Sequence, residues 1–242
     1  MNICIDQGNS KTKMAVFDAG RLVVDVLCRE SAVSVLDELC STYPIDKAIY
    51  SSVSGYDPVL VERVKNRVGH YLQMNAALHL PLVNDYSTPE SLGVDRLAAA
   101  VGGYFLKPNQ NLLIIDAGSA VTYDFVSADG HYVGGNIAPG LKMRLRALHD
   151  YTAKLPLVSV QEDEKLPVFG SSTTEAIAAG VLNGMIYEMN GYINEMVQKY
   201  GSICVFLTGG NLSYFHNQLN NTTFAEKNLV MYGLNQILEC NA

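Results

Sequence analysis

The chain has 242 residues, 48% of them hydrophobic, and a formal net charge of -7. At roughly 100–200 residues per domain, this length suits one large domain or two small ones, and we expect two compact lobes. No cluster of lysine and arginine is longer than a pair, so the sequence lacks the basic footprint of a nucleic-acid-binding protein.

The cysteines and the first residues bear on the compartment. The five cysteines are odd in number and never spaced as Cys-x-x-Cys, which argues against a disulfide framework and against a zinc site. The first residues include an acidic Asp6 and lack the basic segment with which a signal peptide begins. No run reaches the ~18 apolar residues that a membrane span needs. We therefore expect a cytoplasmic protein without a membrane partner.

The first predicted elements are two strands around a polar turn, in the stretch MNICIDQGNSKTKMAVFDAG. The first strand ends at Asp6, and Gly8 permits the positive φ of a tight turn. The backbone N–H groups of such a turn can point at one spot and bind a phosphate, with the carboxylate beside it. An ordinary hairpin turn is the competing interpretation, because Gly-Asn is a common choice there.

A strand over AIYSSV and a helix over Pro58–Val68 come next, followed by a helix over Leu92–Tyr104. Near the start of that last helix stand Asp95 and Arg96, preceded by Tyr86. An aspartate there can simply be a favourable partner of the helix dipole. In the functional interpretation, Asp95 is a general base for an alcohol and Arg96 binds a carboxylate through its planar guanidinium group. Tyr86 then lines the pocket and forms hydrogen bonds.

The stretch LLIIDAGSAVT at residues 112–122 repeats the opening stretch. Three pairs of residues match at one constant offset: Asp116 with Asp6, Gly118 with Gly8, and Thr122 with Thr12. The match is short, so chance is the alternative to a duplicated domain, which we expect to divide the chain into residues 1–108 and 109–242. Two phosphate-binding hairpins indicate phosphoryl transfer, in which Lys13 could reach the transferring group or could be a solvated surface residue.

Three later segments complete the pattern. A third glycine turn follows the apolar strand in VFLTGGNLSYF, and the long helix over SSTTEAIAAGVLNGMIYEMNGYINEMVQKY begins with a Ser/Thr-then-Glu start signal. The segment APGLKMRLRALHDYTAKLP alternates apolar and basic residues around Met143 and Leu145. We expect this segment to contact a second chain, and packing on its own domain is the alternative.

Together these motifs resemble the type III pantothenate kinases, members of the acetate and sugar kinase/Hsp70/actin superfamily. DQGNSKTK resembles the ATP-phosphate motif, LGVDR the substrate motif, and IDAGSAVTYD the second phosphate motif. GGNIAPGL and TAKLP resemble the connecting segment, and GSSTTEAIAAG the helix entry at the substrate pocket. The resemblance implies an α/β fold of two duplicated ribonuclease-H-like (actin-like ATPase) domains, with mixed sheets flanked by helices.

The resemblance also implies a reaction and its participants. The γ-phosphoryl group of ATP, which carries Mg²⁺, would pass to pantothenate, in the first step of coenzyme A biosynthesis. A monovalent cation, K⁺ or NH₄⁺, would be required, and the protein would be a homodimer whose pocket both subunits close. The alternatives are another small-molecule kinase of the same superfamily and a nucleotide-binding regulatory or accessory protein.

Residue roles follow from the matching positions. Asp95 would be the catalytic base, and Asp116 would bind the monovalent cation. The ATP contacts would be Asp6, Gln7, Gly8, Asn9, Ser10, Lys11, Thr12, Lys13 and Ser119. The pantothenate contacts would be Tyr86, Gly93, Val94, Asp95, Arg96 and Thr173. The sequence departs from the family pattern at Gln7, at Ser119 and at Ser171-Ser172.

Overall fold

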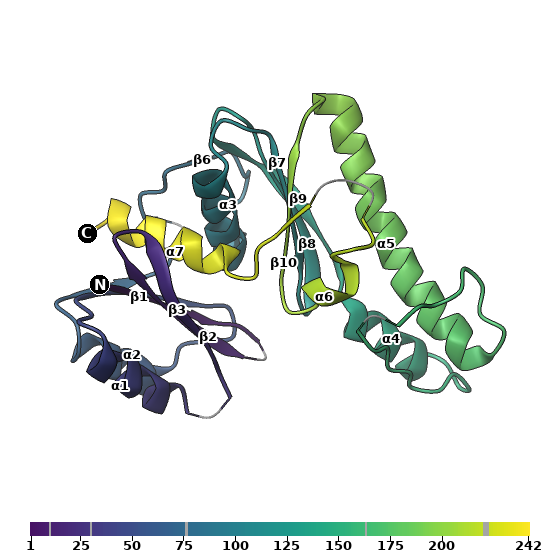
Figure 1. Ribbon diagram of the computed structural model, residues 1–242, viewed down its shortest axis with the longest axis horizontal. Helices are drawn as coiled ribbons and strands as arrows, with labels where there is room; N and C mark the ends of the chain where they lie inside the picture. Colours follow the sequence, from purple (N-terminus) through teal and green to yellow (C-terminus); the bar gives the residue numbers. More distant parts are fainter. Residues whose placement is uncertain (10, 30, 76, 163, 220–222) are drawn as a thin grey trace. The chain divides into compact units, whose positions relative to one another are not determined.

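The computed structural model describes residues 1–9, 11–29, 31–75, 77–162, 164–219 and 223–242 (Figure 1). The chain forms two compact units. Unit 1 contains Met1–Asn109, Val126–Val133 and Asn228–Ala242, and unit 2 contains Gln110–Phe125 and Gly134–Lys227. The division into duplicated domains at residues 108 and 109 stays a prediction.

Unit 1 is built on a five-stranded sheet with the strand order β3-β2-β1-β4-β5. Its strands are β1 (Asn2–Gln7), β2 (Thr12–Asp18), β3 (Arg21–Cys28), β4 (Lys47–Ser52) and β5 (His70–Gln73). The first three strands pair antiparallel, whereas β1 pairs with β4 and β4 with β5 in parallel. Residues in the middle of β1, β2 and β4 are fully buried, which places the core of this unit along the central strands.

The described residues of unit 1 form the α-helices α1 (Ala32–Thr42), α2 (Pro58–Lys65), α3 (Val94–Leu106) and α7 (Leu229–Cys240). The unit also contains the short strand β6 (Val83–Asn84) and the 3₁₀ helix η1 (Pro89–Ser91). Helix α2 starts with Pro58 directly after its N-cap, Asp57, whose carboxylate accepts hydrogen bonds from Val59 and Leu60. It ends three residues before the predicted limit, while α3 is displaced by two residues from its predicted span.

Helices α3 and α7 cross at two glycines and lie side by side in Figure 1. A Cβ atom on Gly102 would lie 3.0 Å from the backbone nitrogen of Gly233 and would overlap the carbonyl oxygen of Leu229. A Cβ atom on Gly233 would lie 2.6 Å from the carbonyl carbon of Ala98. Glycine therefore allows the two helix backbones to touch, and the last helix of the chain supports the helix that carries Asp95.

The second sheet repeats the topology of the first. Its order is β11-β10-β7-β8-β9-β6, so β9-β8-β7-β10-β11 reproduces β3-β2-β1-β4-β5. The strands are β7 (Leu112–Ala117), β8 (Ala120–Val126), β9 (His131–Pro139), β10 (Cys204–Thr208) and β11 (Thr223–Ala225). Strand β10 is parallel to β7 and β11, and β8 reverses direction after a two-residue turn, so this sheet is also mixed.

The hairpins of the two sheets share their glycine positions but differ in length. Gly20 and Gly130 both adopt left-handed backbone conformations, with φ of 80° and 85°, at the second turn of each copy. In the first turn Gly8 N–H donates to the carbonyl of Lys11, and in its counterpart Gly118 N–H donates to that of Ala120. The second turn is shorter, so Thr12 is the first residue of β2 whereas Thr122 is the third residue of β8, and the gapless match of these two threonines is wrong.

Three helices belong to unit 2: α4 (Leu141–Asp150), α5 (Thr173–Tyr200) and α6 (Leu212–Phe215). The hydroxyl of Ser172 accepts a hydrogen bond from Glu175 N–H, and the Glu175 carboxylate accepts one from Ser171 N–H, which confirms the predicted start signal. The apolar stripe of α5 packs into the core of the unit, where Met185 and Met189 are almost fully buried.

Helix α4 corrects one expectation. Leu141 and Leu145 are buried in the core of unit 2, and Leu148 packs against the same core. Residues at i, i+4 and i+7 share one face of a helix, so the segment buries its apolar side within its own chain. Leu145 therefore cannot be a contact to a second chain, whereas Met143 is 51% exposed.

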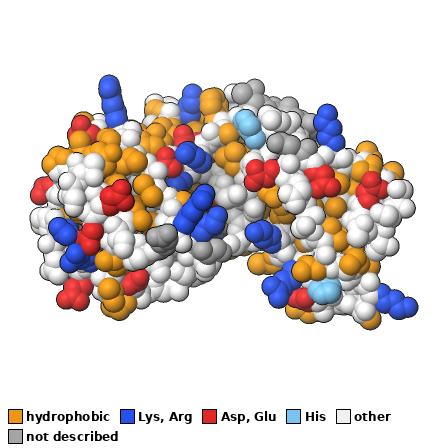
Figure 2. All heavy atoms as spheres, turned by 60° about the horizontal axis from the view of Figure 1, so that its bottom comes forward, with side chains coloured by type: hydrophobic (Ala, Val, Ile, Leu, Met, Phe, Trp, Pro, Cys, Tyr) orange, Lys and Arg blue, Asp and Glu red, His pale blue; other side chains and the backbone are white. Residues whose placement is uncertain are grey.

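The surface carries charges of both signs. On the face shown in Figure 2, basic side chains are interspersed with acidic and hydrophobic ones. None of the helices in the described part of the chain is long and apolar enough to span a membrane.

Candidate active site

Three charged residues of unit 1 meet at the end of β1. Asp6 pairs across the hairpin with Lys13, and the carboxylate of Asp95, at the start of α3, is close enough to act on Asp6 electrostatically. The Oδ1 atom of Asp6 is buried and accepts no hydrogen bond. Burial, followed by repulsion from Asp95, raises the pKa of Asp6 to about 6, and the charge of Lys13 and the hydroxyl of Ser51 oppose the shift.

This pair of carboxylates suits a cation. An unsatisfied buried carboxylate oxygen beside a second carboxylate is a costly arrangement unless a positive charge compensates it. Hard oxygen donors of this kind are the ligands that Mg²⁺ takes together with phosphate oxygens. The residues therefore fit the magnesium ion that accompanies ATP, although no group of three or more acidic, histidine or cysteine side chains within the described ranges forms a complete metal site.

A tight turn joins β1 and β2 as predicted, but Gly8 does not adopt the positive φ that the sequence suggested. Gly8 N–H donates to the carbonyl of Lys11 at 3.0 Å, and a Cβ atom on Gly8 would lie 3.3 Å from that oxygen. Asn9 and Lys11 are exposed in this turn, while Ser10 lies outside the described residues. The assignment of the segment from Asp6 to Lys13, including Thr12, to ATP stays a prediction.

Gln7 makes a contact that the sequence did not indicate. Its side-chain oxygen accepts a hydrogen bond from the hydroxyl of Tyr50 at 2.6 Å, and Tyr50 is fully buried. The same hydroxyl accepts from the backbone N–H of Asp57 at 3.2 Å. The side chain of Gln7 thus ties the end of β1 to the start of α2.

The predicted substrate residues of unit 1 come together at the start of α3. Arg96 is 6% exposed, and its guanidinium carbon lies 5.8 Å from the centre of the Tyr86 ring. Asp95 Oδ1 accepts a hydrogen bond from Arg96 N–H at 2.9 Å, and a Cβ atom on Gly93 would lie 2.6 Å from that oxygen. Gly93 therefore leaves room for the carboxylate of Asp95, while Val94 is partly buried beside it.

Unit 2 gathers three glycine-containing turns around Asp116, at the end of β7. Gly209, with φ of 95°, follows β10, where Thr208 pairs with Asp116. A Cβ atom on Gly209 would overlap the carboxylate of Asp116 and lie 2.7 Å from the carbonyl oxygen of Ala117. The carboxylate and these turn carbonyls supply the oxygen donors that a monovalent cation would need.

Two residues of this arrangement were missed in the sequence. Asn211 donates from its side chain to the carbonyl of Gly118 and from its backbone to that of Ala117, both at 2.9 Å. A Cβ atom on Gly140 would lie 2.7 Å from the carbonyl oxygen of Gly118 and would overlap that of Ser119. The sequence does contain a signal for both residues: a Gly-Gly-Asn turn follows one strand, and a Pro-Gly pair follows another strand.

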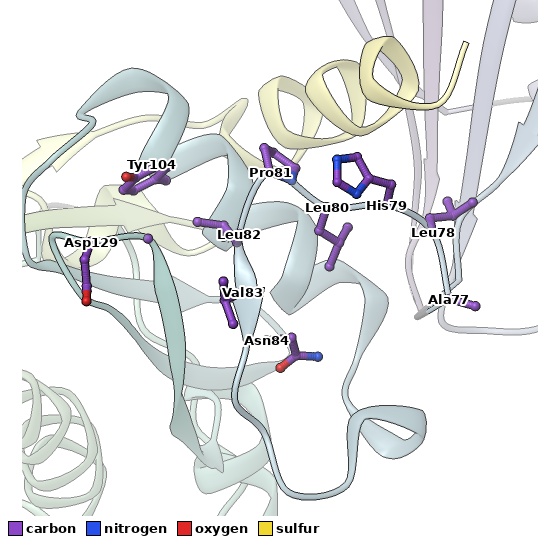
Figure 3. Close-up of a pocket in the computed structure, with 11 residues that line it drawn as sticks. Ala77, Leu78, His79, Leu80, Pro81, Leu82, Val83, Asn84, Tyr104 and Asp129 are labelled. Carbon is purple, nitrogen blue, oxygen red and sulfur yellow. The ribbon is translucent and has the colours of Figure 1, made fainter.

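Two further predicted site residues, Ser119 and Thr173, lie in unit 2. Ser119 lies in the turn after β7, and Thr173 is the exposed first residue of α5. A cavity of about 700 Å³ in unit 1 is lined by residues 77–84, Tyr104, Asp129 and Gly130 (Figure 3). None of the predicted site residues lines it.

A family model described as "Type III pantothenate kinase" matches residues 2–195. The chain belongs to this family. Among curated members, type III pantothenate kinases from Phocaeicola vulgatus and Bacteroides fragilis are 43% and 41% identical over 241 residues. The alignments cover 100% of this chain and 99% and 98% of those proteins. The predicted family and its kinase activity are thus confirmed.

Solved structures show that the fold of this type III pantothenate kinase family member is shared more widely. A protein from Campylobacter jejuni described as a Baf family transcriptional activator has a TM-score of 0.60 at 21% identity, over 98% of this chain and 97% of that one. The activator of 2-hydroxyisocaproyl-CoA dehydratase from Clostridium difficile, with bound ADPNP, has a TM-score of 0.55 at 11% identity, over 99% and 95%. The predicted fold class is confirmed by the repeated mixed sheets and by these neighbours.

Proposed function

We propose that this kinase transfers the γ-phosphoryl group of ATP to the primary hydroxyl of pantothenate, forming 4'-phosphopantothenate in the first step of coenzyme A biosynthesis. The observation that carries the proposal is membership of the type III pantothenate kinases over most of the chain. The meeting of Asp6, Lys13 and Asp95 in one unit supports it, because phosphoryl transfer depends on positioning and on charge compensation.

In the proposed mechanism, the residues of unit 1 act on the acceptor. Arg96, stacked on Tyr86, binds the pantothenate carboxylate with its planar fork. Asp95 takes the proton of the hydroxyl, so that the oxygen attacks the γ-phosphorus as the bond to the leaving ADP oxygen breaks. Magnesium, held by Asp6 together with the phosphates, would neutralise charge on the transferring group. Lys13 adds a positive charge on the same side of the hairpin as Asp6.

The direct test is the ATP-dependent conversion of pantothenate by the purified protein, followed by mass spectrometry of the product. A panel of other alcohols, with and without a carboxylate, separates this reaction from that of a different small-molecule kinase. Formation of phosphopantothenate alone is expected, since Arg96 requires a carboxylate on the acceptor. ATP binding without product on any acceptor would favour a regulatory role, the second interpretation of the sequence.

A monovalent cation at Asp116 is a further part of the proposal. Turn carbonyls and a carboxylate at the end of β7 are the donors, and Gly209 and Asn211 hold the neighbouring turn against them. Potassium or ammonium there would screen the charge of the nucleotide. A cytoplasmic location also stays a prediction, and it agrees with the use of ATP as a substrate.

We also propose a homodimer, formed through unit 2. Among the large apolar side chains that are exposed there, Ile137 is 67% exposed, Met143 51% and Tyr187 61%. Each adjoins, in sequence, one member of a single contact network: Asn136, Arg144 and Glu188. In that network Arg144 donates to Glu188 at 2.8 Å, Tyr123 donates to Glu188 at 2.7 Å, and Tyr123 stacks on Tyr192, which Asn136 contacts.

A rigid network beneath exposed apolar residues is typical of a protein interface. The replacement Met143→Glu should therefore convert dimer to monomer in sedimentation experiments, whereas Val59→Glu, at a residue of unit 1 that is 65% exposed, should not. If sites are shared between chains, Met143→Glu should also reduce activity. A wild-type protein that sediments as a monomer would refute the dimer.

A further inference from the structure

Strand β6 is short, yet it leads directly to Tyr86. It consists of Val83 and Asn84 and pairs in parallel with the first two residues of β9. Val83 N–H donates to the carbonyl of Gly130 at 2.9 Å, and Asp85 N–H donates to that of Tyr132 at 3.0 Å. A two-residue strand at a sheet edge gains little stability from its backbone pairing, so side-chain contacts also matter for holding this segment.

Packing does not supply all of that support. Val83 is 51% exposed, and the segment 77–84 runs along the cavity described above (Figure 3). The turn before β9 contributes Asp129 and Gly130 to the same cavity. One flank of β6 is therefore open, and the segment depends on its partners in β9.

A side-chain pair joins the two segments at this point. Nδ1 of His131 lies 2.8 Å from Oδ2 of Asp85, and Nε2 of His131 lies 3.9 Å from Oδ2 of Asp129. The hydroxyl of Ser127 donates to Asp129, which fixes that carboxylate and is the main reason that the pKa of Asp129 is lowered. The imidazole of His131 is thus held between two carboxylates.

Tyr86 follows Asp85 directly in the sequence. Its N–H donates to the side chain of Asn84 at 3.1 Å, and its ring meets the buried ring of Tyr132 edge-on, with centroids 6.1 Å apart. The other contact of the Tyr86 ring is the guanidinium of Arg96. The position of this ring, and with it the covering of Arg96, therefore depends on the register between β6 and β9.

We propose that His131 and Asp85 are positioning residues that hold β6 against β9, so that Tyr86 covers Arg96 and the acidic acceptor binds tightly. The proposal rests on the proposed function, in which Arg96 and Tyr86 bind a carboxylate-bearing substrate. Neither His131 nor Asp85 touches substrate, and their action passes through the backbone of Asp85 and the rings of Tyr86 and Tyr132.

The test uses Asp85→Asn, His131→Gln and the double variant that carries both changes, in the full chain. An exposed pair of this kind contributes about 0.2–1 kcal/mol, which corresponds to a change in affinity of up to about fivefold. Each single variant should raise KM for pantothenate by about two- to fivefold, without changing kcat or KM for ATP. The double variant should lose little more than either single variant, because each single change already breaks the pair.

Hydrogen exchange provides a second readout that does not require catalysis. The amides of Val83 and Asp85 should exchange faster in both single variants. Asp37→Asn is the control: it breaks another exposed pair of unit 1, at 2.7 Å from Arg63, and should leave KM for pantothenate and exchange at β6 unchanged.

Unchanged exchange and KM in the single variants would overturn the proposal, and so would faster exchange with an unchanged KM. A loss in the double variant equal to the product of the two single losses would mean that the two residues act independently, and would overturn the role of the pair itself. If the wild-type protein forms no phosphopantothenate, the proposed function fails instead, and the exchange comparison alone decides whether the pair holds β6.

Discussion

Replacing Asp6 by asparagine should make the substrate-free protein more stable at neutral pH, even though it removes a residue that we place at the ATP site. The pKa of Asp6 is raised from 3.8 to about 6, first by burial and then by the carboxylate of Asp95. The native state therefore holds a proton on Asp6 between about pH 4 and 6, where the unfolded state has released it. By linkage, the free energy of unfolding falls as pH rises through this window and stays low above it.

The size of the effect follows from the shift. About two pH units at 1.36 kcal/mol each give about 3 kcal/mol as an upper limit on the cost of the charged form. This cost already includes the opposing attraction of Lys13, and the buried amide of asparagine has a smaller desolvation cost of its own, so we expect a gain of about 1–3 kcal/mol at pH 7.5. The gain should shrink toward zero near pH 4, where Asp6 is protonated in both states.

Urea unfolding at pH 4.5, 6 and 7.5, without nucleotide or divalent ions, measures this gain directly. Asp18→Asn provides the control, because Asp18 is an exposed carboxylate at the end of the neighbouring strand β2. An Asp6→Asn protein that is no more stable than wild type at pH 7.5, or whose advantage does not depend on pH, would refute the reasoning.

Three further predictions concern the site. Asp95→Asn should lower turnover by about 10²–10⁴-fold while the affinity for ATP, measured by calorimetry, changes little; retained turnover would make Asp95 only a helix-dipole partner. Activity should fall when potassium and ammonium are replaced by tetramethylammonium, and Asp116→Asn should weaken the response to potassium; equal rates in all salts would contradict a cation site. Gly209→Ala should destabilise the protein in urea by about 1–3 kcal/mol, because φ is 95° and the new methyl group meets Asp116, whereas Gly210→Ala, with open space, should cost less.

Local motifs were the part of the site that could be predicted from the sequence. Gly93, Asp95 and Arg96 lie within one turn of α3, so their proximity follows from helix geometry alone. The approach of Asp95 to Asp6 could not be predicted in the same way, because it depends on how α3 packs near the end of β1. The same holds for Asn211, whose bonds to Ala117 and Gly118 cross between two parallel strands.

The errors have physical causes. The alternation of apolar and basic residues around Met143 and Leu145 suggested a contact to a second chain, but in a helix Leu145 joins Leu141 and Leu148 on one side. The hairpin repeat was aligned without a gap, and a turn can lose a residue while its glycine and its closing hydrogen bond remain. Topology was predicted better than these details, because a repeated strand-turn-strand pattern constrains the order of strands more than their length.

The crossing of α3 and α7 makes unit 1 depend on a segment that lies far away in the sequence. The unit is complete only when residues 228–242 pack on the helix that begins near Asp95. Phe17 and Asn2 likewise find their partners in Tyr232 and Asn235 of α7, more than two hundred residues later. Folding of this unit during translation is therefore incomplete until α7 has been synthesised. A variant that lacks residues 228–242 would keep every proposed catalytic residue and still lose the helix that supports Asp95.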